Sequence, residues 1–86
     1  MNFLNATQIE NNKAMYQALV GKEVTLMVTG ERVKGTVKEF QESEFSFTLV
    51  VEHEPVNWGG DIYTTATPFA RKCDNWGSLN KLEVIE

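Results

Sequence analysis

Two side chains in the sequence are of the types that carry out nucleophilic chemistry, Cys73 and His53. Cys73 directly follows Arg71 and Lys72, and neighbouring positive charge favours the reactive thiolate form of a cysteine. With His53 as a base, the pair could form a nucleophile–base dyad. The sequence gives no sign of a third orienting residue or of an oxyanion site. We therefore interpret Cys73 as a plain loop thiol and expect no catalytic residues and no enzyme activity.

The same residues offer little for a metal or a cofactor. One histidine and one cysteine occur among scattered carboxylates, without the ligand spacing of the recognised metal sites. The glycine pair Gly59-Gly60 is part of a turn and of no phosphate-binding motif. We expect no metal, no cofactor and no small-molecule substrate. His53, placed between Glu52 and Glu54, is interpreted as a solvated loop histidine.

Three basic residues are the best candidates for contacts with nucleic acid: Arg32, Lys34 and Lys38. They alternate along a predicted strand, which places them together on its outer face. A half-buried strand also presents polar residues to solvent for solubility alone, and lysine protects the edges of sheets. No clear aromatic stacking platform accompanies these bases. Nucleic-acid binding of the RNA-binding type through this face is kept as the alternative hypothesis.

A tripeptide occurs twice, as Asn57-Trp58-Gly59 and as Asn75-Trp76-Gly77, each time in a predicted loop. A tryptophan in a glycine-flanked polar loop either covers one end of the core or serves as a binding hot spot. In the predicted fold, a helix already covers one end of a small core. We therefore expect at least one of Trp58 and Trp76 to be exposed.

Acidic residues dominate the middle of the chain. The formal net charge is −4, and every charged residue from Glu39 to Asp61 is acidic, Glu52 and Glu54 included. A negative chain is a poor general binder of polyanions, whereas a dipolar one orients protein partners. We predict a non-catalytic binding module, a small regulator or adaptor that binds another protein or itself. The candidate contact residues are Trp58, Trp76, Asp61, Glu52 and Glu54.

A helix is predicted at about residues 7–20. Two capping boxes compete for its start, one formed by Thr7 and Glu10 and the other by Asn5 and Gln8. Ile9, Tyr16, Met15 and Leu19 form one apolar stripe. Gly21 supplies the left-handed residue that commonly follows a helix.

About five strands follow, at residues 22–29, 32–40, 45–52, 62–67 and 81–85. Gly30-Glu31 suits a type II′ hairpin, and Gly35 on the inner face of the second strand permits a sharp bend. In the third strand, the alternation directs four apolar residues inward: Phe45, Phe47, Leu49 and Val51. Trp58 to Asp61 and the stretch from Phe69 to Ser78 are interpreted as loops.

Residues 8–51 resemble a known family of small barrels. Leu19-Val20-Gly21-Lys22-Glu23-Val24-Thr25-Leu26, a turn at Gly30, and Val33-Lys34-Gly35-Thr36-Val37 are similar to the first motif of Sm-like proteins and to SH3-like barrels in general. Sm-like RNA binders carry an aspartate and an asparagine where this chain has Gln41 and Phe45. The second Sm motif is missing near residues 79–82. The resemblance therefore implies the fold, and the RNA-binding residues do not carry over.

Length and composition set the frame for these elements. Eighty-six residues with 42% hydrophobic and 23% charged side chains are typical of one small globular domain, here residues 1–86. No apolar run is long enough to span a membrane, and the N-terminus does not resemble a signal peptide. A single cysteine favours a reducing, cytoplasmic setting. The fold class expected is mainly β (α+β), with an N-terminal helix followed by a small, strongly bent antiparallel sheet or an SH3-like/Sm-like barrel.

Overall fold

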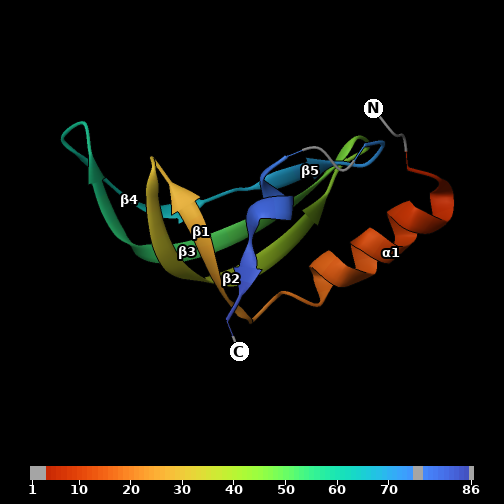
Figure 1. Cartoon of the computed structure of the whole chain (residues 1–86), viewed down its shortest axis with the longest axis horizontal. Coiled ribbons are helices and arrows are strands. Elements are labelled where there is room, and N and C mark those ends of the chain that lie inside the picture. Colours follow the sequence, from red (N-terminus) through yellow and green to blue (C-terminus); the bar gives the residue numbers. More distant parts are fainter. Residues whose placement is uncertain (1–3, 75–76, 86) are drawn as a thin grey trace.

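A computed structural model describes residues 4–74 and 77–85 of the 86-residue chain. One helix is followed by strands and a short 3₁₀ helix (Figure 1). In chain order the elements are α1 (Ala6–Gln17), β1 (Glu23–Val28), β2 (Glu31–Glu42), β3 (Ser46–Trp58), β4 (Asp61–Ala66), β5 (Phe69–Arg71), η1 (Ser78–Lys81) and β6 (Glu83–Val84). The expected mainly β class with an N-terminal helix is confirmed.

The strands form one antiparallel sheet that stays open. The strand order is β4-β3-β2-β1-β6, and β5 extends the sheet beside the first half of β3. There are six strands, one more than predicted, and the described residues show no pairing that joins β4 or β5 to β1 or β6. The bent antiparallel sheet is thus confirmed, whereas the described residues do not show a closed barrel. In Figure 1 the sheet curves strongly, and β5 and η1 lie across the hollow of that curve.

Gly35 lies where β2 is most crowded. It pairs with Val24 of β1 on one side and with His53 of β3 on the other. A Cβ atom at Gly35 would lie 2.8 Å from the carbonyl oxygen of Glu52 and 2.8 Å from Cγ1 of Val51. The expected close approach of the backbone at this glycine is confirmed. Since Cβ atoms do not tolerate such distances, only glycine fits here without a shift of its neighbours.

A register shift between Val37 and Glu39 changes the buried face of β2. Val33 and Val37 are buried before the shift, and Phe40 packs against the core after it. The extra residue is Lys38, so the alternation of buried and exposed residues breaks after it, whereas Lys38 itself is exposed like Arg32 and Lys34.

The β1–β2 hairpin differs from the expected one. Val28 pairs with Glu31, and the two residues between them, Thr29 and Gly30, have φ angles of 49° and 85°. Two positive φ angles are the mark of a type I′ turn. The predicted type II′ turn centred on Gly30-Glu31 is therefore wrong by one residue.

The third strand is longer than predicted and begins later. Phe45, expected to point inward, precedes β3 and is 73% exposed. β3 then continues to Trp58, six residues past the predicted end at 52, through a second register shift between Glu52 and Val56. That shift accommodates Pro55, because a proline is tolerated in a strand where the regular ladder is interrupted. The predicted loop at Trp58–Asp61 is thus the end of a long hairpin.

The C-terminal third also departs from the prediction. Phe69–Arg71, expected to be loop, forms β5 along Ser46–Thr48 of β3. The expected last strand at 81–85 is reduced to the two residues of β6, because Ser78–Lys81 forms η1, whose Leu79 is buried in the core. Sheet pairing with β3 decides the state of β5, which sequence periodicity over three residues could not show.

The helix begins as one of the two predicted capping boxes requires. The side chain of Asn5 accepts a hydrogen bond from the Gln8 backbone, and the Gln8 side chain accepts one from the Asn5 backbone, both at 2.9 Å. The alternative pair, Thr7 and Glu10, does not form the cap. Tyr16 is buried and its ring lies 5.9 Å from that of Phe47. In the described residues, no helix is long and apolar enough to cross a membrane.

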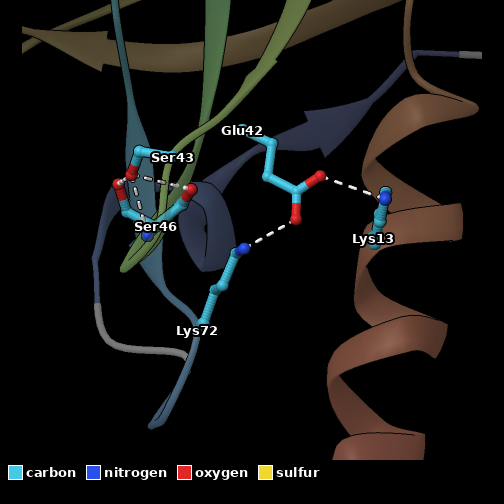
Figure 2. Close-up of polar contacts among 5 residues, drawn as sticks. All are labelled: Lys13, Glu42, Ser43, Ser46 and Lys72. Atoms are coloured by element: carbon cyan, nitrogen blue, oxygen red, sulfur yellow. Dashed lines mark hydrogen bonds and ion pairs between the residues drawn. The ribbon is translucent and has the colours of Figure 1, made fainter.

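Two lysines bracket one carboxylate and tie the helix to the sheet (Figure 2). Glu42 at the end of β2 lies 3.0 Å from Nζ of Lys13 on α1 and 2.6 Å from Nζ of Lys72 after β5. Hydrogen bonds from Lys72 and Lys13 hold the pKa of Glu42 below its ordinary value. The same carboxylate raises the pKa of Lys13. This ion triad therefore links three segments that are distant in the sequence.

Candidate interaction surface

The end of the β3–β4 hairpin brings an exposed tryptophan and an aspartate together. Trp58 is the last residue of β3 and pairs directly with Asp61, the first of β4. Gly59 and Gly60 between them have φ angles of 64° and 86°, as in a type I′ turn. Trp58 is 59% exposed. The hairpin forms one end of the molecule's long axis and projects past the β1–β2 hairpin (Figure 1).

The register of the hairpin decides which side chains share a face. Trp58 pairs with Asp61, and Val56 pairs with Tyr63, so these four side chains point to one face. Trp58 and Tyr63 are therefore diagonal neighbours on that face, close enough for aromatic side chains to interact. Tyr63 is 38% exposed, whereas Val56, on the same face, is buried. Ile62 points to the opposite face and is 65% exposed.

The other predicted contact residues lie elsewhere. Glu52 and Glu54 are exposed on β3, but Glu52 precedes the second register shift and Glu54 lies within it, whereas Trp58 follows it. Six residues of extended chain separate Glu52 from Trp58, a distance of up to roughly 20 Å. Trp76 lies outside the described residues. The structure thus brings Trp58 and Asp61 together and separates them from the two glutamates.

Glu52 and Glu54 instead face basic and acidic neighbours from the adjacent strands. They line a shallow depression of about 350 Å³ together with Glu23 of β1 and Lys34 of β2. Glu23 and Glu52 both pair with Thr36, which places them in one row across three strands. The depression therefore has mixed charge, with three carboxylates around one ammonium group.

The basic face of β2 is accompanied by acids. Arg32, Lys34 and Lys38 are all exposed. Arg32 forms an ion pair with Glu83 of β6, and Lys34 borders the acidic depression. Lys38 occupies the bulge of β2. Because acidic neighbours partly neutralise the charges of Arg32 and Lys34, the basic face of β2 presents less positive potential than the sequence alone indicates.

His53 is buried, which corrects its interpretation as a solvated loop residue. It continues the inward alternation of β3 and is 6% exposed. Its Nδ1 lies 2.7 Å from the carbonyl oxygen of Glu54, and its Nε2 is buried without a hydrogen-bond partner among the described residues.

Cys73 is exposed on the segment that follows β5. No group of three metal-ligating side chains occurs in the described part of the chain.

An apolar groove lies at the open side of the sheet and had no counterpart in the predictions. It has a volume of about 390 Å³ and lies between β1, the β4–β5 connection and η1. Its lining includes Leu26, Met27, Pro68, Phe69 and Leu82. These residues come from three separate segments, so no local sequence signal could have identified the groove. The exposure of Ile62 and Tyr63 was also missed, although the Gly59-Gly60 pair flanked by strand-forming residues is a hairpin signal.

Comparison with known protein families identifies one match. Residues 11–84 match the family described as "Domain of unknown function (DUF7258)". The chain belongs to this family. The matched range begins within α1 and contains all strands of the sheet, the β3–β4 hairpin included. Searches among curated proteins and among solved structures each found no match.

Proposed function

We propose that this DUF7258 domain is a non-catalytic protein-binding module, a small regulator or adaptor that holds its partner at the end of the β3–β4 hairpin. The observation that carries the proposal is Trp58, which is 59% exposed beside the two-residue turn of this hairpin. A large apolar side chain gains most from burial against a partner when little conformational freedom is lost in doing so. The pairing of Trp58 with Asp61 and of Asn57 with Ile62 holds the backbone of this anchor in the sheet.

The neighbours of Trp58 support this role. Tyr63 lies diagonally across the same face and Asp61 lies directly opposite. Tryptophan and tyrosine are enriched among the residues that dominate binding energy, in part because an aromatic ring buries a large area with few rotatable bonds. Asp61 supplies a carboxylate at the rim of this pair. A partner with an apolar pocket and a basic residue beside it matches this surface.

The finer features of fold and location are part of the same proposal. We propose that the sheet is an open variant of the SH3-like or Sm-like arrangement, a view supported by the helix before β1 and by the bend at Gly35. We further propose a cytoplasmic location, supported by the exposed free thiol of Cys73, since a reducing compartment preserves such thiols.

Affinity capture with matched bait proteins tests the proposal. The wild-type chain, Trp58→Ala and Met27→Ala are used as baits in lysate of the native cell, and the captured protein is then titrated. Met27 is the matched control because it is also 59% exposed and lies near the turn of the other hairpin. We expect Trp58→Ala to lose more than about 2 kcal/mol of binding free energy, roughly thirtyfold in Kd, while its melting temperature stays close to wild type.

Two outcomes contradict the proposal. Binding that survives Trp58→Ala excludes the hairpin end as the anchor, and binding that is lost only together with the folded state shows that Trp58 stabilises the core. Capture of nucleic acid with a steep salt dependence, abolished by the double variant Lys34→Gln/Lys38→Gln, replaces the proposal with the alternative function.

A further inference from the structure

The two edges of the sheet differ in how they are protected. On one edge, β6 covers Val24 and Thr25 of β1 with only two residues, and its Glu83 is ion-paired with Arg32, while the described residues place no strand beside the end of β1 at 26–28. The β4 edge has six residues, of which five are exposed, and the described residues place no strand beyond it. Asp61–Ala66 contains no lysine, arginine or proline. Short length, charge and proline are the devices that keep an edge from pairing, and β4 has none of them within its span except Asp61 at its start.

The composition of β4 favours the formation of sheet. Ile62, Tyr63, Thr64 and Thr65 are β-branched or aromatic, the types that pack well in strands. Along an edge strand, the N–H and C=O groups of alternate residues point away from the sheet and can pair with an incoming strand. This edge is therefore equipped for β-strand addition.

We propose that β4 pairs antiparallel with β4 of a second copy of this chain, so that one sheet runs through both copies. This inference goes beyond the proposed function, since it places a second copy along β4 and not at the side chain of Trp58. A two-fold axis perpendicular to the sheet does not exchange the two faces of the sheet, and residues that pair directly point to the same face. The pairing must therefore be centred on one residue, either Tyr63 or Thr64, which lies opposite the same residue of the other copy. In either register the two Asp61 side chains lie near opposite ends of the joined strands.

Charge does not oppose the meeting of two copies along β4. The chain carries a net charge of −4, so two copies repel each other overall. In the proposed pairing, each Asp61 faces a threonine of the other copy, and no like charges are opposed directly. The interface is isologous and closes as a dimer, which leaves no free β4 edge for further addition.

Sedimentation velocity on the full chain over a dilution series tests the dimer. The variants are Thr64→Lys, which brings two lysines close together across the two-fold axis, and Gln17→Lys, an exposed control on α1 with the same change of charge. We expect a wild-type dimer that dissociates on dilution and a Kd at least about tenfold higher for Thr64→Lys, because like charges opposed in an interface are costly. Gln17→Lys should match the wild type. Hydrogen exchange should show β4 amides that become protected as concentration rises.

A wild-type chain that stays monomeric at millimolar concentration overturns the inference, and so does a dimer that Thr64→Lys leaves unchanged. The two proposals can fail separately. A monomeric chain that captures another protein through Trp58 refutes the dimer and leaves the binding function intact. A dimer that is sensitive to Thr64→Lys, together with capture that is insensitive to Trp58→Ala, supports the dimer and refutes the hairpin anchor.

Discussion

Substitution of Gly35 by alanine tests the packing at the bend of β2. The new methyl group would lie 2.8 Å from the carbonyl oxygen of Glu52, 2.8 Å from Cγ1 of Val51 and 3.0 Å from Cβ of His53. Two of these three atoms are side-chain atoms of a buried strand, and the third belongs to its backbone. None is the end of a flexible side chain, so the strands themselves must move apart.

The expected cost follows from two opposing effects. Overpacking of a well-filled site costs about 1–3 kcal/mol. Loss of glycine's freedom in the unfolded chain returns about 0.4–1 kcal/mol. The net destabilisation for Gly35→Ala is therefore about 1–2 kcal/mol, and Gly35→Val, with two further methyl groups, should cost more than alanine. A domain of this size holds only ~3–5 kcal/mol in total, so the valine variant should be close to unfolded at room temperature.

Urea unfolding followed by circular dichroism, together with thermal melting, measures this effect. For a domain of this length, each kcal/mol corresponds to roughly 4–8 °C in melting temperature. Lys34→Ala serves as the control, because its side chain is exposed on the same strand one position earlier. If Gly35→Ala melts at or above the wild-type temperature, the close approach of β2 and β3 is refuted.

Three further predictions concern a turn, an ion triad and a tryptophan. Thr29→Asn should raise the free energy of unfolding by about 0.5–1 kcal/mol, because asparagine tolerates the φ of 49° better, and an unchanged urea midpoint would contradict the type I′ turn. Because the pKa of Glu42 is lowered in the folded state, its contribution is present above its ordinary value of 4.5 and is lost as the pH falls through the lowered value. The stability difference between wild type and Glu42→Gln should therefore be present at pH 7 and shrink in acid, as urea titrations at a series of pH values would show; a constant difference would contradict the triad. In a Trp76→Phe background, Trp58 should emit at long wavelength and be quenched by iodide, whereas blue-shifted, protected emission would show that it is covered.

The sequence was sufficient for the elements whose patterns are local. The helix shows one of the predicted capping boxes and a buried Tyr16, although it ends at Gln17, three residues before the predicted end, and Met15 of the predicted stripe is 52% exposed. β1 and the first part of β2 alternate cleanly, so their boundaries were predicted within one or two residues. Gly35 was predicted to mark a close approach of the backbone, because a glycine on the inner face of a strand has no side chain to pack and weakens the strand otherwise.

The second half of the sheet could not be derived in the same way. Pro55 is a strong signal against strand, and only the pairing of Val56 with Tyr63 beyond it shows that β3 continues. β5 has three residues, and its state depends on the edge of β3 left open next to β4. In both segments, long-range pairing overrides local propensity, and register is a tertiary property.

The candidate site shows the same division between local and tertiary information. Glu52, Glu54 and Asp61 belong to one acidic stretch of sequence, which suggested one acidic surface. In the fold, the register shift before Val56 separates the two glutamates from the hairpin end, and they join Glu23 and Lys34 from other strands. Trp58 and Asp61 stay together because a two-residue turn makes them direct partners. Any acidic contribution to binding at Trp58 therefore comes from Asp61, and Asp61→Asn should weaken capture of a basic partner, whereas Glu52→Gln should not.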